Sequence, residues 1–177
     1  MQKNIFAIVG SASSDSANLK LVNLFAILTK DDFHVNIFSR LQSLPHFDAD
    51  ITINHVPANI TEFRRLINDA DGILICTPEY IFSIPSRLKN AIEWCVATTI
   101  FSNKPIGMIT ASANGQKGHE ELQLIMKTID AKFTAGTTLL IQGVKGKIND
   151  NGMISDEKTE KDFRHFIQSF KELIRNS

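Results

Sequence analysis

The chain has 177 residues, of which 43% are hydrophobic, and this is enough to form one domain with a sizeable core. Nineteen basic and nineteen acidic side chains cancel, so no net charge attracts nucleic acid or an anionic membrane. The first apolar run, residues 5–9, is too short for a signal-peptide core or a membrane span. We therefore predict a single cytoplasmic domain over residues 1–177, with no nucleic-acid partner and no membrane partner.

Strand and helix patterns alternate through the first part of the chain. Apolar runs predict strands, apolar residues at helical spacing predict helices, and clusters of small, polar or proline residues predict loops. In chain order these patterns predict a strand at residues 5–9, a loop at 10–17, a helix at 17–30, a strand at 35–38, an irregular crossing at 39–57 and a helix around 60–67. Ser16 is the expected N-cap of the first helix.

Residues 73–94 join a buried strand to an amphipathic helix. The continuous apolar run at residues 73–76 is typical of a central parallel strand that helices cover on both faces. A polar loop with proline leaves that strand at its carboxyl end, where open α/β sheets bind their ligands. A helix is predicted over residues 85–96, with Pro85 in its first turn and Ser83 as its cap.

The second half of the chain continues the same alternation. Its patterns predict a strand at residues 105–110, a polar loop at 111–118, a helix carrying the apolar positions between 122 and 129, a strand at 137–141, a hairpin-like excursion at 147–154 and a last amphipathic helix that begins near residues 155–157. Because crossovers between parallel strands are right-handed, this order predicts a doubly wound parallel sheet with strand order 2-1-3-4-5. The loops after strands 1 and 3 then face one another at the switch point of the sheet.

The loop after strand 1 has the chemistry of a phosphate site. Hydroxyl and amide donors at the amino end of a helix bind a phosphate without a cationic side chain. The residues placed for this role are Ser11, Ser13, Ser14, Ser16 and Asn18. Any one of these serines can also be an ordinary cap or turn residue. The loop has neither the GxxxxGK[ST] nor the GxGxxG pattern, so a monophosphate ligand is expected.

The loops after strands 3 and 4 can hold a planar ring. The backbone from Pro78 to Phe82 can lie along such a ring while Tyr80 or Phe82 shields it, and the segment from Ser112 to Gly115 can close its far edge. Packing or a subunit contact is an equally weighted alternative for Tyr80 and Phe82.

Other chemistries find little support in the sequence. Cys76 and Cys95 have no CxxC spacing and are expected to be free, inert thiols. The five histidines show no metal-ligand spacing and are interpreted as surface residues, so no metal is assigned. GxSxG is absent, which argues against an esterase serine.

The motifs GSASSDSAN after strand 1 and TPEYIFSIPSRLKNAIEW after strand 3 resemble those of the NADPH-dependent FMN reductase family, which is flavodoxin-like. The resemblance spans nearly the whole chain and implies an α/β three-layer sandwich that binds FMN, with NADPH or NADH as electron donor. Together with the loops described above, it assigns to the cofactor Ser11, Ser13, Ser16, Asn18, Pro78, Glu79, Tyr80, Ile81, Ser112, Asn114 and Gly115. Ser13 and Ile81 replace an arginine and an asparagine that are usual in the family.

The resemblance also implies the reaction. Bound FMN takes hydride at its N5 from NAD(P)H and passes electrons to a quinone, an azo compound, a metal oxyanion or free flavin, so no catalytic side chain is assigned. The alternative is a flavodoxin-like FMN electron carrier without turnover of its own. A receiver domain of the same topology is disfavoured, because Thr77 stands where its phosphoacceptor aspartate would be.

The sequence also raises an expectation about assembly. Trp94 lies off the apolar stripe of its helix, so we expect it to be exposed in a monomer. Aromatic residues of this kind are enriched at interface centres. A homodimer or homotetramer is therefore expected, with the helix of residues 85–96 and the loop of residues 79–82 in the interface.

Overall fold

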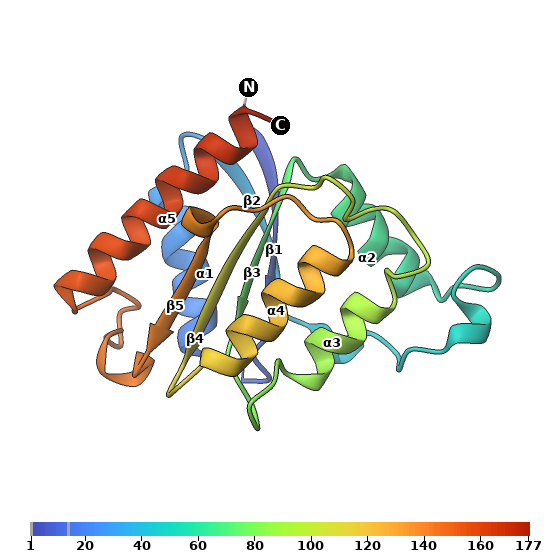
Figure 1. Ribbon diagram of the computed structural model, residues 1–177, viewed down its shortest axis with the longest axis horizontal. Coiled ribbons are helices and arrows are strands. Elements are labelled where there is room, and N and C mark those ends of the chain that lie inside the picture. The colour runs from blue at the N-terminus through green and yellow to red at the C-terminus, as the bar shows by residue number, and fades with distance from the viewer. Residues whose placement is uncertain (1, 14) are drawn as a thin grey trace.

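A parallel sheet lies between two layers of helices (Figure 1). The computed structural model describes residues 2–13 and 15–177. Within them the strands are β1 (Lys3–Val9), β2 (Phe33–Phe38), β3 (Gly72–Thr77), β4 (Ile106–Ser112) and β5 (Thr138–Gln142). The α-helices are α1 (Ala17–Leu28), α2 (Ala58–Asp69), α3 (Ser86–Glu93), α4 (Gln116–Thr128) and α5 (Glu157–Arg175). Short 3₁₀ helices are η1 (Leu41–Ser43), η2 (Ala49–Ile51), η3 (Ala135–Thr137) and η4 (Val144–Gly146).

The strand order is β2-β1-β3-β4-β5 and all four pairings are parallel, which confirms the predicted doubly wound sheet. Helices α1 and α5 cover one face, and α2, α3 and α4 cover the other (Figure 1). Each layer buries its own apolar cluster against the sheet. Successive residues of a strand point to opposite faces, so Ile75 belongs to one cluster and its neighbour Cys76 to the other. The continuous apolar runs in the sequence follow from this double coverage.

Two details of the predicted helices are wrong. Ser83 does not cap α3, because Pro85 occupies the N-cap position and the Ser83 hydroxyl instead donates to the Glu121 carboxylate at 2.7 Å. The α3 helix ends at Glu93, three residues before the predicted end. The carbonyl of Trp94, the C-cap residue, accepts a hydrogen bond from another helix, since Arg64 Nε on α2 donates to it at 2.8 Å.

The expectation that Trp94 is exposed in a monomer is also wrong. Its side chain is fully buried, and the indole Nε1 donates to the Pro45 carbonyl at 2.9 Å. Phe47 packs edge-on against the indole, with ring centroids 5.5 Å apart and an interplanar angle of 81°. The irregular crossing between β2 and α2 folds back over α3 and covers the side of this helix on which Trp94 lies, outside the apolar stripe. Trp94 therefore gives no evidence for a subunit interface.

The same crossing is fixed to α3 by further hydrogen bonds. The Asn90 side chain accepts from the Phe47 backbone N–H at 2.7 Å and donates to the Pro45 carbonyl at 2.9 Å. Arg64 on α2 donates to the Thr52 carbonyl at 3.0 Å as well as to Trp94. Side chains thus replace the regular backbone ladder that this long connection lacks.

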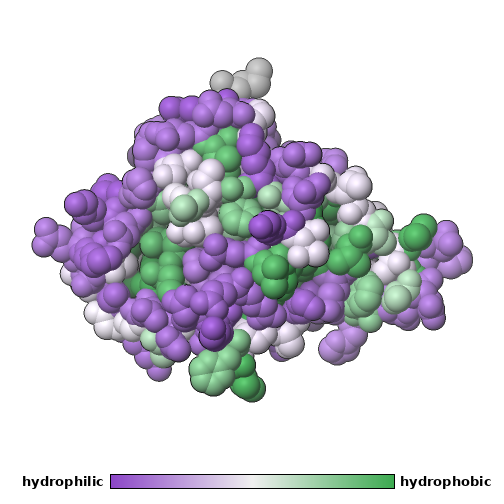
Figure 2. Space-filling model, in the orientation of Figure 1, coloured by the Kyte–Doolittle hydropathy of each residue, from purple (hydrophilic) through white to green (hydrophobic). Residues whose placement is uncertain are grey.

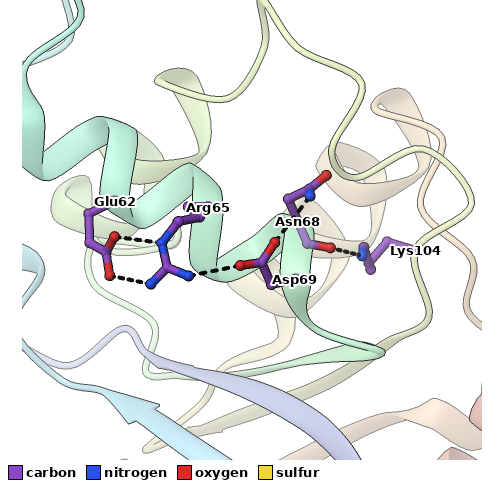
Figure 3. Close-up of polar contacts among 5 residues, drawn as sticks. All are labelled: Glu62, Arg65, Asn68, Asp69 and Lys104. Atoms are coloured by element: carbon purple, nitrogen blue, oxygen red, sulfur yellow. Dashed lines mark hydrogen bonds and ion pairs between the residues drawn. The ribbon is translucent and has the colours of Figure 1, made fainter.

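A second polar network runs along α2 to Lys104, in the segment before β4 (Figure 3). Arg65 pairs with Glu62 and Asp69, and Lys104 donates to the Asn68 carbonyl at 3.0 Å. The pKa of the Glu62 carboxyl is lowered, chiefly by its hydrogen bonds to Arg65. Since the ion-paired groups are exposed, water and salt screen these pairs, and they contribute little to stability.

Replacement of Trp94 by phenylalanine tests the clamp between α3 and the irregular crossing. Trp94→Phe removes the Nε1 donor and leaves unfilled volume, so we expect the free energy of unfolding to fall by about 1–3 kcal/mol. Urea unfolding measures this change. Ile53→Ala, at an exposed position in the same crossing, is the control and is expected to stay within about 0.5 kcal/mol of wild type. Equal stability of Trp94→Phe and wild type would contradict the clamp.

Candidate functional site

The loops at the carboxyl ends of β1, β3, β4 and β5 surround a pocket of about 720 Å³. It lies at the switch point of the sheet, where doubly wound folds bind their ligands. The predicted site residues that line it are Ser11, Ser13, Ser16, Asn18, Pro78, Tyr80 and Ser112. The loops after β1, β3 and β4 are far apart in the sequence, and they meet at the switch point that the predicted strand order indicated. Ser14, which was also a candidate phosphate donor, lies outside the described residues.

Close approach of β1 and β3 brings two of these loops together. The Gly10 backbone N–H donates to the Cys76 carbonyl at 2.8 Å, which extends the pairing of the two strands by one residue. A Cβ atom at Gly10 would lie only 2.7 Å from the Thr77 Cβ. Any larger residue would force the two strand ends apart, so glycine is required at this position.

Hydroxyl and backbone donors gather at the amino end of α1. Ser16 caps the helix, as predicted, with its Oγ accepting from the Leu19 N–H at 3.1 Å. The Ser11 Oγ accepts from the Ser13 N–H at 3.2 Å. A hydroxyl that accepts a hydrogen bond keeps its own proton to donate, so both serines can also bind an anion in the pocket. The first N–H groups of α1 add the positive end of the helix dipole.

Asn18 is buried and connects α1 to the sheet. Its Nδ2 donates to the Ala111 carbonyl on β4 at 3.2 Å, and its Oδ1 accepts from the Cys76 thiol at 3.4 Å. Both contacts hold the start of α1 against the carboxyl ends of β3 and β4. Asn18 thus shapes the wall of the pocket as well as lining it.

Four predicted site residues lie outside the pocket lining. The Glu79 carboxylate turns to the amino end of α4, where it accepts from the N–H groups of Gly115 at 3.2 Å and Gly118 at 2.8 Å. Gly115 is the N-cap of α4 and has a φ of +87°, which favours glycine. Asn114 accepts from the Gln142 side chain at 3.0 Å. These contacts join the loops after β3, β4 and β5, and the remaining residue, Ile81, points into solvent.

Ile81 and Phe82 form the tip of a tight turn. Tyr80 and Ser83 exchange two backbone hydrogen bonds, of 2.9 and 3.1 Å, and the two tip residues have φ values of 52° and 58°. This left-handed conformation is unfavourable for a β-branched residue such as isoleucine. The Ile81 side chain is 96% exposed and that of Phe82 is 70% exposed. Figure 2 shows hydrophobic surface on the loop that projects from the lower edge of the molecule in this view.

One histidine was wrongly interpreted as a surface residue. His119, in the first turn of α4, is buried and shares a hydrogen bond of 2.9 Å with the Thr110 hydroxyl on β4. Burial lowers its pKa below the usual 6.5. The spacing of His119, Leu122 and Met126 places all three on the inward face of α4, and this pattern was available in the sequence. The other four histidines are exposed.

The sequence reasoning also missed part of the pocket wall. Asp15 and Lys20 line it from the side of α1, and Lys145 and Asp150 line it from the connection between β5 and α5. Only Lys20 had a readable signal, because it lies one helical turn after Ser16 on the same face of α1. Asp15 and Asp150 are in loops and Lys145 is in the short 3₁₀ helix η4, and the local sequence does not define the course of these segments.

Both cysteines are buried and free, as predicted. Loss of hydration raises the pKa of the Cys76 thiol strongly and that of Cys95 to about 12, so neither forms a reactive thiolate near neutral pH. Within residues 2–13 and 15–177, no group of three acidic, histidine or cysteine side chains is arranged to hold a metal ion. In the same part of the chain, no helix combines the length and apolar character that crossing a membrane requires.

The fold and the pocket define a flavodoxin-like protein with a site suited to a flavin mononucleotide. Residues 3–145 match the family described as NADPH-dependent FMN reductase, and the chain belongs to this family. It is 30% identical to a 2-hydroxy-1,4-benzoquinone reductase of Burkholderia sp. over 183 positions, which cover 99% of this chain and 98% of that protein. A quinone reductase of Escherichia coli K12 is 25% identical over 97% of this chain and 95% of its own.

Structural comparison agrees with the sequence relatives. FerB, a flavoenzyme NAD(P)H:(acceptor) oxidoreductase from Paracoccus denitrificans, superposes with a TM-score of 0.86 and 25% identity over 98% of each chain. The resemblance predicted from the two motifs is thus confirmed, and the protein is an FMN-dependent NAD(P)H oxidoreductase. The pocket has hydroxyl and backbone N–H donors at the amino end of α1, which can bind an anion, and its volume lies in the range of cofactor pockets.

The buried His119 predicts a pH-dependent stability that a substitution can remove. Its folded-state pKa is lowered, so below about pH 6.5 the unfolded chain binds a proton more readily than the folded protein, and stability falls as the pH decreases. One such proton changes the free energy of unfolding by at most about 1.4 kcal/mol per pH unit. Urea unfolding between about pH 7.5 and pH 5.5 is expected to show a smaller loss for His119→Gln than for wild type.

The exposed His165 supplies the matched control for this measurement. His165→Gln removes the same titratable group from the outer face of α5 and is expected to keep the wild-type pH dependence. Identical pH profiles for His119→Gln and wild type would contradict the assignment of a neutral, buried imidazole.

Proposed function

We propose that FMN occupies the pocket at the switch point, with its phosphate at the amino end of α1 and its ring system between the loops after β3 and β4. One observation supports this proposal most strongly. The serines at the amino end of α1, which can donate to a phosphate, line the same pocket as the loops after β3 and β4, which can hold a planar ring. Ser11, Ser13 and Ser16 donate to the phosphate in this arrangement. Pro78 and Ser112 lie along the ring, and Tyr80 shields one side of it.

FMN, when bound, supplies the redox chemistry, because its ring accepts a hydride from NAD(P)H and passes electrons to a second substrate. The residues of this chain bind, orient and shield. Glu79 fixes the loop after β3 to the start of α4, and Glu121 fixes the same loop through Ser83 at 2.7 Å and the Ile84 N–H at 2.8 Å. Two carboxylates thus hold the ring-binding loop in place before any ligand arrives, which reduces the cost of ordering it on binding.

The proposed electron acceptor is a quinone. Two relatives that align over nearly the whole chain are named quinone reductases, and one of them acts on a hydroxylated benzoquinone. Azo compounds, metal oxyanions and free flavin are the other acceptor classes that the motifs predicted. A carrier without turnover of its own is less well supported, because these relatives are reductases.

Steady-state kinetics test the acceptor. Purified protein loaded with FMN is expected to oxidise NADPH or NADH rapidly with 1,4-benzoquinone, and more slowly with an azo dye, chromate or free FMN, at equal concentrations. The mass of the released cofactor identifies it as FMN. If no acceptor accelerates the oxidation of NAD(P)H, the carrier alternative is supported. If another acceptor class gives faster turnover than 1,4-benzoquinone, that class replaces the quinone as the proposed acceptor.

We also propose that residues 1–177 act as one domain in the cytoplasm. NAD(P)H as the electron donor fits that compartment, and so do two free cysteines, which are usual in proteins of reducing compartments. The apolar clusters on the two faces of the sheet include residues from β1 to α5, which fits a single cooperative unit.

Assembly as a homodimer or homotetramer is part of the proposal, and it now depends on the turn after β3. Ile81 and Phe82 are the most exposed part of an otherwise well-anchored loop, and both have a positive φ. A strained turn that presents two large apolar side chains is stabilised when a second copy covers them. The tip projects next to Tyr80, so a partner subunit would lie near the pocket of the first.

Replacement of the tip by the residues that such a turn prefers tests the dimer. The double variant Ile81→Asn, Phe82→Gly relieves the left-handed strain, so the monomer is expected to gain about 2 kcal/mol of stability. The same change removes the apolar contact, so sedimentation or light scattering is expected to show a shift from dimer to monomer. Ile53→Asn, which removes another exposed apolar side chain, is the control and keeps the dimer. A monomeric wild-type protein would contradict the proposal.

A further inference from the structure

In the proposed site, the phosphate lies at the amino end of α1, and the serines described there, Ser11, Ser13 and Ser16, carry no positive charge. Among the residues that the structure describes, the charged side chains that line the pocket are Asp15, Lys20, Lys145 and Asp150. A phosphate monoester brings a charge of about −1.5 to −2 near neutral pH, and hydroxyl donors do not neutralise it. One of the two lysines is therefore expected to approach the phosphate.

We propose that Lys20 is the cationic partner of the FMN phosphate and that it exchanges its ion pair with Asp15 for the phosphate when the cofactor binds. This inference rests on the proposed FMN site. It adds a residue that selects a phosphorylated flavin over one without the phosphate.

The position of Lys20 supports this role. Its backbone N–H donates to the Ser16 carbonyl at 3.0 Å, so it lies one turn after the residue that caps α1. Side chains on a helix lean toward its amino end, and the long lysine side chain thus extends back toward the serines. The aliphatic part of its side chain, its stem, packs against the hairpin after β5. A Cβ atom added to Gly152 in that hairpin would lie 3.5 Å from the Lys20 Cβ. Only 26% of the side chain is exposed.

The present partner of Lys20 is weakly bound. The Lys20 Nζ lies 3.5 Å from the Asp15 carboxylate, and the Asp15 side chain is 83% exposed. Water screens such a pair, so little is lost when it breaks. A phosphate at the capped end of α1 offers more charge and three acceptor oxygens, and charge-assisted hydrogen bonds of this kind are the strong ones. Asp15 then competes with the phosphate for the same ammonium group.

Lys145 is less well placed. It follows β5, and β3 and β4 separate β5 from β1 in the sheet. Strands about 4.8 Å apart put the ends of β1 and β5 roughly 14 Å from one another. Lys145 also lies on the exposed surface, whereas the stem of Lys20 is held by the hairpin.

Titration of the apoprotein with two flavins tests the assignment. Lys20→Met keeps the stem and removes the charge, and it is expected to weaken FMN binding roughly tenfold. Riboflavin, which lacks the phosphate, is expected to bind both proteins within about twofold. Lys20→Arg restores the FMN affinity. The affinity of wild type for FMN falls more steeply with salt than that of Lys20→Met, because the variant has lost one screened charge pair.

Two further variants separate this role from a general effect of charge. Lys145→Met removes the other cation of the pocket and is expected to change FMN and riboflavin affinity by the same factor. Asp15→Asn removes the competing carboxylate and is expected to tighten FMN binding, with riboflavin unchanged. A melting curve of apo Lys20→Met that matches wild type shows that the fold is intact.

The outcomes are distinct. Equal FMN affinity of Lys20→Met and wild type overturns the assignment, and so does an equal loss of FMN and riboflavin affinity. A selective loss of FMN in Lys145→Met alone would assign the phosphate to Lys145 instead. A wild-type protein that binds neither flavin would contradict the proposed cofactor site itself, whatever the role of Lys20.

Discussion

The site depends on the pairing of β1 with β3 at their carboxyl ends. Gly10 continues this pairing with its N–H bond to Cys76, and the absence of a side chain lets the two strand ends approach. The chain leaves β1 toward α1 on one face and leaves β3 toward α3 on the other, so the two loops diverge at this point (Figure 1). The divergence opens the pocket, and the contacts of Asn18, Glu79 and Glu121 stabilise the elements around it.

The long motif after β3 combines three structural roles. Its first residues shape the pocket, with Pro78 and Tyr80 in the wall and Glu79 bound to the start of α4. Its turn, Ile81 and Phe82, is exposed and strained. Its last residues, among them Trp94, hold the irregular crossing after β2 against α3. The motif thus includes positions whose side chains hold the fold together, and each role has its own physical cause.

Much of the fold could be predicted because its signals are local. The apolar runs of the strands, the Ser16 cap and the stripe of α5 each depend on residues that are near one another in sequence. The burial of Trp94 could not be read in this way, because its partner Pro45 is 49 residues away and lies in a segment without periodicity. The contact of the Glu79 carboxylate with the N–H groups of Gly115 and Gly118 could not be read from the sequence either, because these residues are 36 and 39 positions away. Side-chain contacts between loops depend on tertiary structure, which local patterns do not encode.

The charged side chains around the pocket make two kinds of contact, which are multiple hydrogen bonds that fix a loop and a weak ion pair that can be exchanged. The carboxylates of Glu79 and Glu121 accept several hydrogen bonds and fix the loop after β3 to α4. The Lys20 Nζ lies 3.5 Å from the Asp15 carboxylate, and the Asp15 side chain is 83% exposed, so this ion pair can be exchanged. In the proposed binding mode, rigid contacts hold the loop beside the planar part of the flavin, and a replaceable ion pair lies where its charged phosphate enters. Such a division reduces the ordering cost of binding while leaving a cation available for the phosphate.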